Sequence, residues 1–593
     1  MRALWRALVV AMLCVTPLGA PDSRLAQSAT FARAAPDIPP MLYGFLDHTA
    51  PHPFDPPNAT TLGPTGSMGS FRWEDVNPAP GVFDWSAIED EIAPERALTV
   101  TLRSGEVISR PLVLQVFAHL HALPGWEEAY FYDATPQWVY ERIDAENPAD
   151  PRPTIGGRKV GYLLASGDAR AVLPVYDHAT WQAAYWDLVA AFGARYNDDP
   201  QVASVVINTG LDGETQPIKT WRDVDWNAVL SSSVGPQVGW SFSNFALATM
   251  DAYHAAFPDV ALFINNAPGG SGMRRSTSEH AAALDPPVGL KHSGMWTDID
   301  IHEGSGTFVG SWDMVRAYSM TLPIWVESAY GFGDAGHDYW SLLAGLHYHP
   351  DAIDLHPAYF ETVDPEVLRW VGDRVGRTVD EAPSVWTALR DTEYPPVSWG
   401  SGGASGHIGD WTYWLYRVDG EGGRTVRIWR EDLPVEARDA IYARQARRTD
   451  QGTSQQVIYL DVDDDWPHAA ASPEAWHGPA PDLTLRVVFL NQGDDALGVH
   501  YRQASGRAAL ITLNKGAGLG PTNEWVDRTV TLPEARLDNG LLTSGARGYD
   551  LRIDCMGDGD EVVHLVELMP AEAPTPAPTV PPGRPLFLPL VLS

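Results

Sequence analysis

Cysteine is almost absent from the sequence, and this scarcity excludes a fold held together by disulfide bonds. The 593 residues contain two cysteines, Cys14 and Cys555. Cys14 lies in an N-terminal segment that we expect to be cleaved off, which leaves Cys555 without a partner for an intrachain disulfide. Stability must therefore come from the size and packing of the hydrophobic core.

Basic residues are scarce as well. The chain has 41 Lys and Arg against 76 Asp and Glu, which gives a formal net charge of −35. Proteins that bind nucleic acid place clusters of Lys and Arg against the phosphates, so this balance argues against a nucleic-acid partner. Long apolar runs are also missing. The runs near the two ends are too short to cross a bilayer, and we predict no transmembrane span.

The N-terminus has the pattern of a secretory signal peptide. Arg2 and Arg6 precede an apolar run at residues 7–15, and cleavage would follow Ala20 or fall within residues 32–34. We therefore expect a bacterial protein that is secreted or attached to the cell surface. A proline-rich linker at residues 571–582 leads to an apolar tail at residues 584–593. This tail resembles a C-terminal signature of some exported bacterial proteins, and it is either a docking tag or a disordered end.

Strand and helix signals alternate eight times between residues 42 and 356, which predicts an α/β fold of the (β/α)8 TIM barrel type. The expected strands lie at residues 42–47, 67–73, 112–120, 202–214, 261–265, 288–291, 323–327 and 352–356. A helix is predicted to begin at Ser86, and two more at 180–196 and 242–257. An inserted hairpin at 97–109 and a long excursion at 123–177 interrupt the alternation, and loops of that length are usually functional.

The pattern changes after about residue 380, where short alternating strands follow one another between turn residues. This spacing predicts an all-β sandwich domain. The expected organisation is a signal peptide and disordered start at 1–35, the barrel at 36–375, the sandwich at 376–570, and the linker and tail at 571–593. The sandwich carries VHY at 499–501, NEW at 523–525 and GYDLRI at 548–553. With these pieces it resembles ancillary modules of glycosidases, which either bind carbohydrate or brace the catalytic barrel.

Two of the predicted barrel strands end on carboxylates. The run at 202–214 ends on Glu214, and the run at 323–331 carries Glu327 ahead of small residues. A parallel barrel presents its catalytic groups at the C-terminal ends of its strands. Glycoside hydrolysis needs two carboxyl groups, one as the acid and one as the nucleophile or base. The pair therefore predicts a glycosidase, and structural acids held in salt bridges are the alternative.

Three stretches resemble the β-galactosidase-like (β/α)8 glycoside hydrolases, over about residues 40–360. They are Arg72-Trp73 followed by EDVNPAPGVFDW at 74–85, ARYNDDP at 194–200 and WVE at 325–327. The resemblance implies a retaining O-glycosyl hydrolase without a redox cofactor, in which Glu214 is the acid/base and Glu327 the nucleophile. One position departs from the family, because Gly213 stands where an Asn usually precedes the acid. Either Asn208, Asn265 or Asn266 takes that role, or the chain is a distant branch, or Asp212 is the true acid.

Other candidates for contact with a carbohydrate substrate lie at or near strand ends. Arg72, His119 and Tyr330 are expected hydrogen-bond donors for Glu327. Trp296, Trp325 and Trp340 are either sugar platforms or core residues, since Trp suits both. The full set of predicted binding residues is Arg72, Trp73, His119, His121, Asn208, Asp212, Asn265, Trp296, Tyr330 and His356.

No metal and no cofactor are predicted. The groups at 300–303 and 347–349 lack convincing ligand spacing. The acidic run at 461–465 is either a calcium ligand set or a solvated turn. A rival reading from another class is a non-catalytic cell-surface protein that binds carbohydrate on a degenerate barrel. A third is a lyase or metal-dependent hydrolase, which chelation would inactivate.

Overall fold

The computed structural model describes residues 39, 41–45, 65–121, 126–219, 229–230, 240–266, 271–295, 312–328, 335–356, 358–390, 397–399, 404–406, 410–418, 426–429, 432–453, 456–542 and 548–571. The predicted signal peptide and almost all of the predicted linker and tail lie outside these residues. No helix in the described ranges is both long and apolar enough to span a membrane.

Parallel strands close into an eight-stranded barrel, which confirms the predicted fold class. Each barrel strand pairs with the next barrel strand along the chain, and the last of the eight pairs with the first. The strands are β1 (Met41–Phe45), β2 (Thr65–Arg72), β5 (Leu112–Phe117), β12 (Val202–Ile207), β13 (Ala261–Asn265), β14 (Gly289–Ser293), β15 (Ile324–Glu327) and β16 (Ala352–Leu355).

Two predicted strands end earlier than the sequence suggested. The third ends at Phe117, and the chain continues as β6 (His119–His121), which pairs antiparallel with β7 (Phe131–Asp133). The fourth ends at Ile207, so Glu214 lies beyond the strand itself. The predicted hairpin is present as β3 (Thr99–Thr101) and β4 (Val107–Ser109). The excursion contains α4 (Gln137–Glu146) and two further hairpins, β8 (Thr154–Ile155) with β9 (Arg158–Lys159) and β10 (Tyr162–Ser166) with β11 (Ala169–Leu173).

Helices connect the barrel strands, and several begin at capping residues. The hydroxyl of Ser241 accepts the Asn244 backbone N–H at the start of α7. Asp364 caps α13 in the same way, with Pro365 at the first helical position. The helices are α2 (Trp73–Val76), α3 (Ser86–Arg96), α5 (Ala179–Tyr196), α7 (Phe242–Ala256), α8 (Ser271–Ala283), α10 (Asp313–Tyr318), α11 (Ala335–His347), α12 (Ala358–Thr362) and α13 (Pro365–Gly372).

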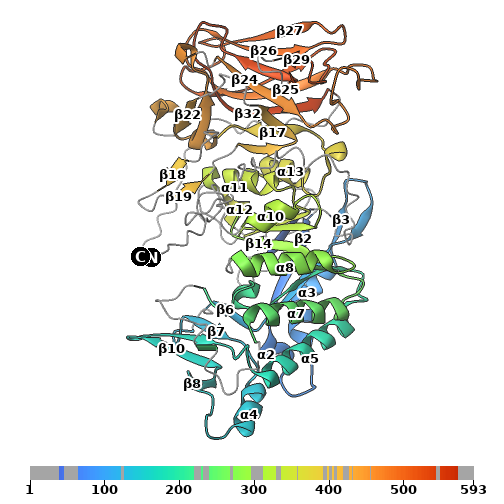
Figure 1. Ribbon diagram of the computed structural model, residues 1–593, viewed down its shortest axis with the longest axis vertical. Helices are drawn as coiled ribbons and strands as arrows, with labels where there is room; N and C mark the ends of the chain where they lie inside the picture. Colours follow the sequence, from blue (N-terminus) through green and yellow to red (C-terminus); the bar gives the residue numbers. More distant parts are fainter. Residues whose placement is uncertain are drawn as a thin grey trace, which may run out of the picture.

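Two antiparallel sheets follow the barrel, as the sequence predicted. One contains β17 (Val385–Ala388), β20 (Trp411–Tyr413), β22 (Val426–Trp429), β23 (Gln445–Arg448), β25 (Leu483–Leu490), β28 (Trp525–Leu532) and β32 (Val562–Pro570). The other contains β21 (Leu415–Val418), β24 (Val457–Val462), β26 (Ala496–Arg502), β27 (Ala508–Asn514) and β31 (Leu551–Asp554). Figure 1 shows the first sheet, with β17 and β32, on the side nearer to the barrel.

Both α11 and α13 lie between the barrel and the sandwich and contact the sandwich (Figure 1). The indole N–H of Trp340 on α11 donates to the carbonyl of Ile441 over 2.9 Å. The indole N–H of Trp370 on α13 donates to the Glu567 carboxylate on β32 over 3.0 Å. Trp340 is therefore a core residue of this interface rather than a sugar platform.

Candidate functional site at the barrel mouth

The inward-facing positions of the barrel strands change from apolar to polar at their C-terminal ends. One buried cluster fills the barrel interior, with Met41, Tyr43, Met68, Val113, Val206, Ala261, Phe263, Trp325 and Ala352. Side chains two residues apart on a strand point to the same face. The next inward positions are therefore polar on most strands, namely Ser70, Gln115, Asn208, Asn265, Glu327 and Asp354. Lys291 pairs in register with both Asn265 and Trp325, and it joins this polar layer.

Glu327 lies at the end of β15 and contacts a buried lysine. Its carboxylate forms an ion pair with the Nζ of Lys291 on β14, and it accepts a hydrogen bond from the Ser293 hydroxyl over 3.0 Å. The Lys291 side chain is 1% exposed, and its Nζ lies 3.2 Å from Asp354 on β16. Burial lowers the pKa of Lys291, and the charge of Asp354 opposes this shift. Glu327 is thus held between a cation and a hydroxyl donor.

Glu214 reaches the same mouth by a tight turn after β12. Asp212 has φ of 53° and Gly213 has φ of 75°, and these two left-handed residues form the turn that precedes Glu214. Glu214 then adopts an extended conformation and forms an isolated parallel bridge with Asn265, the last residue of β13. The bridge places Glu214 beside the end of β13, with which β12 also pairs.

The Glu214 carboxyl group is buried in a charged environment, with its side chain 6% exposed. Its oxygens contact the Lys219 ammonium over 3.0 Å and the amide of Gln216. Burial raises the pKa of Glu214, and the Asp212 charge adds to this rise while Lys219 opposes it. Asp212 behaves differently. Although burial alone would raise its pKa, hydrogen bonds from His121 and the charge of Lys219 lower it to about 2.

Asn265 and Ser293 connect the segments that carry the two glutamates. The Asn265 amide donates to the Ser293 hydroxyl over 2.8 Å, and Ser293 donates to Glu327 over 3.0 Å. Asn265 is also the main-chain partner of Glu214. In addition, the charge of Glu214 acts on the pKa of Lys291. The two predicted carboxylates therefore belong to one site.

Asn208 occupies the space beside the unusual Gly213. A methyl group added at Gly213 would lie 2.0 Å from the Asn208 Oδ1, so only glycine fits there. This Oδ1 is buried and has no hydrogen-bond partner among the residues that the structure describes. Of the three asparagines considered for the missing family residue, Asn208 thus lies closest to that position in space.

We expect Gly213→Ala to destabilise the protein by roughly 1–3 kcal/mol, because the left-handed conformation is strained for alanine and the methyl group displaces Asn208. Gly105→Ala is the matched control, since Gly105 has φ of 84° but open space around its Cβ position. Urea unfolding of both variants measures the two costs, since Gly105→Ala reports the backbone strain alone and Gly213→Ala adds the steric contact with Asn208. Equal losses in the two variants would contradict the proposed contact with Asn208.

Arg72 and Trp73 lie apart from this network. The Arg72 guanidinium binds the Asp75 carboxylate over 2.7 and 3.0 Å and approaches Glu74. Trp73 has no exposed surface and packs edge-on against Trp181. Its ring also packs edge-on against Tyr185, so the prediction for Trp73 is corrected to a core role.

The two histidines of β6 have different surroundings. His119 is fully buried, where its Nε2 faces the Val172 carbonyl and its Nδ1 the Tyr176 hydroxyl. Burial lowers its pKa to about 4, so it is neutral and serves the core. His121 is half-exposed, and its Nδ1 contacts the Asp212 carboxylate. Among the described residues, the donors that contact Glu327 are Lys291 and Ser293, whereas the predicted Arg72 and His119 contact other partners.

The remaining predictions fall at the rim or outside the described residues. His356 follows β16, and its backbone N–H donates to the Ser328 hydroxyl over 2.7 Å. Trp325 belongs to the barrel interior and donates to Asp354 over 2.7 Å. Trp296, Tyr330 and the group at 300–303 lie outside the described residues. His347 is buried at the sandwich interface beside Thr412, where burial lowers its pKa to about 3.

Sequence reasoning missed Lys291, Asp354 and Lys219. The signal for the first two was present, because each is a charged residue within a short predicted strand. In a strand whose inward positions are otherwise apolar, a charge at the C-terminal end points to the mouth. Lys219 gave no such signal, since it lies in a loop.

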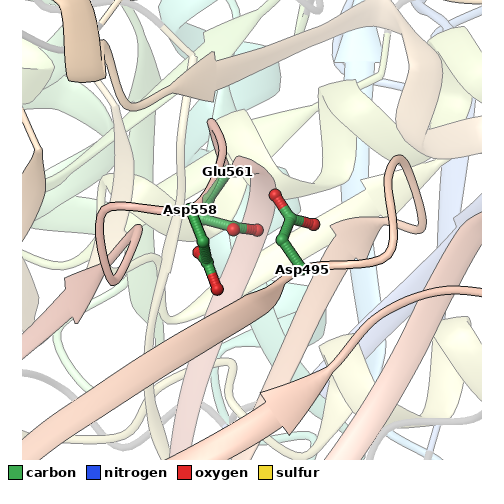
Figure 2. A group of neighbouring side chains, drawn as sticks. All are labelled: Asp495, Asp558 and Glu561. Atoms are coloured by element: carbon green, nitrogen blue, oxygen red, sulfur yellow. The ribbon is translucent and has the colours of Figure 1, made fainter.

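The metal-capable carboxylates found among the described residues lie in the sandwich, away from residues 461–465. The side chains of Asp495, Asp558 and Glu561 are neighbours (Figure 2), and one carboxylate oxygen of each lies within 4.8 Å of the others. The Lys515 ammonium already contacts two of them, Asp495 over 2.7 Å and Glu561 over 3.0 Å. This lysine supplies the counter-charge that a cation would otherwise provide.

Neither a family model nor a curated protein matches the sequence. Among solved structures, the chain is similar to a catalytic mutant of Gan42B, a GH42 β-galactosidase from G. stearothermophilus (9% identity, 59% of each chain, TM-score 0.30). It is also similar to a β-galactosidase from Marinomonas ef1 (13% identity, 56% of this chain and 59% of that one, TM-score 0.32). A psychrophilic GH10 endo-β-1,4-xylanase aligns at 13% identity over 53% of this chain and 85% of its own, with a TM-score of 0.27. The chain thus spans less than two thirds of either β-galactosidase, and scores this low carry no argument about function.

Proposed function

We propose that the protein is a secreted glycoside hydrolase that cleaves O-glycosidic bonds of an oligo- or polysaccharide with retention of configuration. Glu214 is the acid/base and Glu327 the nucleophile. The carrying observation is that two carboxyl groups at one barrel mouth, each beside a lysine, differ in burial, since the Glu214 side chain is 6% exposed and that of Glu327 is 17% exposed. Burial raises the pKa of Glu214, whereas Glu327 contacts the Lys291 ammonium, which favours the anion.

This division matches the chemistry. The acid must hold a proton near neutral pH to protonate the leaving oxygen, and the nucleophile must stay ionised. Asp212, the alternative acid, has a pKa of about 2 and carries no proton to donate. Asn208 and Asn265 are the proposed contacts for sugar hydroxyls beside the reacting carbon, since both lie in the polar layer next to Glu214.

A panel of aryl glycosides tests the proposal, with Glu214→Gln and Glu327→Gln as matched variants that keep side-chain size. We expect turnover of at least one glycoside by the wild-type protein and its loss in Glu327→Gln. Product analysis by NMR reports the anomeric configuration. Turnover with inversion would refute the retaining mechanism, and turnover that survives in both variants would refute the site.

A second candidate, a non-catalytic carbohydrate-binding protein, is favoured by one observation. Each glutamate is paired with a lysine, Glu214 with Lys219 and Glu327 with Lys291, and such pairs also occur as structural ion pairs. Calorimetric binding of a glycan by a wild-type protein that turns over no glycoside would favour this candidate.

A further inference from the structure

Lys291 contacts two carboxylates, and one of them belongs to the proposed nucleophile. Its buried ammonium lies between Glu327 on β15 and Asp354 on β16. Asp354 is itself fully buried, and the Trp325 indole N–H donates to its Oδ1 over 2.7 Å. One ammonium and two carboxylates carry a net charge of −1 when all three are ionised.

In a retaining reaction the Glu327 carboxylate loses its charge. A Glu327 oxygen forms a bond to the anomeric carbon while the bond to the leaving oxygen breaks, and that oxygen takes the proton of Glu214. Water then attacks the anomeric carbon, Glu214 takes its proton, and Glu327 leaves as a carboxylate. During the intermediate, a lysine paired with Glu327 alone would be a buried cation without a counter-charge, which is strongly unfavourable.

We propose that Lys291 is a positioning residue that keeps Glu327 ionised and oriented, and that Asp354 is its permanent counter-ion throughout the reaction. This inference rests on the proposed function. Asp354 never enters the reaction, so Lys291 stays paired when Glu327 is esterified. In the resting protein Asp354 also shares the lysine charge, which limits how strongly Lys291 holds Glu327 and leaves the carboxylate able to attack.

In the described part of the chain, the charged groups around Glu327 are Lys291 from β14 and Asp354 from β16, and the charge of Glu214 after β12 acts on Lys291. From these charges we expect opposite effects of two variants on the ionisation of Glu327. Removing Lys291 leaves Glu327 beside a carboxylate and disfavours its anion. Removing the Asp354 charge leaves Lys291 paired with Glu327 alone, which favours the anionic form of Glu327.

The test compares pH profiles of kcat/KM for Lys291→Met, Lys291→Arg and Asp354→Asn on the best aryl glycoside. The acidic limb reports ionisation of the nucleophile in the free enzyme. We expect Lys291→Met to move this limb to higher pH by about 1–3 units. Asp354→Asn should move the acidic limb to lower pH and slow formation of the intermediate. In Lys291→Arg the acidic limb should lie near its wild-type position. Lys159→Met, which removes a surface lysine paired with Asp144, is the matched control.

An unfolding cycle tests the charge arrangement without activity. Lys291→Met should lower the urea midpoint, and adding Glu327→Gln to the same chain should recover part of the loss. The proposal would be overturned if the acidic limb stayed in place, or moved in the same direction, in Lys291→Met and Asp354→Asn. It would also be overturned if the effects of Lys291→Met and Glu327→Gln on stability were additive. If the wild-type protein turns over no glycoside, the proposed function fails and the catalytic role of Lys291 fails with it. The cycle then still decides whether Lys291 stabilises the Glu327 anion.

Discussion

Glu214→Gln is expected to lower kcat on glycosides with poor leaving groups by about 10²–10⁴-fold, the usual contribution of a general acid. Glycosides with an activated leaving group, such as a dinitrophenolate, should lose far less in the glycosylation step, because that group departs without a proton. Steady-state and burst kinetics on a series of aryl glycosides measure the difference. Glu327→Gln should instead lose turnover of every substrate, whatever its leaving group.

The pH profile gives a second measurement on the same residue. The acid works only while protonated, so the rate should fall as the pH rises through the pKa of Glu214, which burial raises. This basic limb should disappear in Glu214→Gln. Asp212→Asn should move the limb to lower pH, because the Asp212 charge contributes to the raised pKa. Equal losses of Glu214→Gln on good and poor leaving groups would show that Glu214 is not the proton donor.

Glu567→Ala is expected to destabilise the protein by about 3–5 kcal/mol, because it leaves a buried cation uncompensated. Glu567 on β32 is fully buried, and it pairs with Arg374 after α13 over 2.6 Å and with Arg486 on β25 over 3.2 Å. Arg486 keeps a second partner in Asp527, whereas Glu567 is the carboxylate that holds Arg374. The change therefore acts on the junction between barrel and sandwich.

Urea unfolding followed by tryptophan fluorescence measures this loss. Glu436→Ala, at an exposed glutamate of the same region, is the control and should change stability by no more than about 0.5 kcal/mol. Burial alone would raise the pKa of Glu567, but Arg374 and Arg486 lower it. Its contribution is therefore complete above the unfolded-state pKa and is lost as the pH falls through the folded one. A Glu567→Ala variant as stable as Glu436→Ala would contradict this role.

Prediction from sequence succeeded where the signal is local. The fifth strand has the predicted bounds 261–265, and the hairpin at 97–109 and the helices at 180–196 and 242–257 are present within two residues at either end. Apolar runs and turn residues follow short-range sterics, so neighbours in the chain suffice to specify them. Trp73 and His119 failed for the opposite reason, since a strand-end aromatic or imidazole looks the same whether it faces the core or a substrate.

The sequence by itself determined a barrel, a β-rich second region and two carboxylates on the C-terminal side of barrel strands, because periodicity and chain order carry that information. The tertiary structure alone decided what surrounds those carboxylates. Strand register brings Lys291 and Asp354 to Glu327, and the Asp212-Gly213 turn brings Lys219 to Glu214. These contacts join residues far apart in the chain or across a turn of unusual geometry. They set the charge state of each carboxyl group, and no local pattern specifies them.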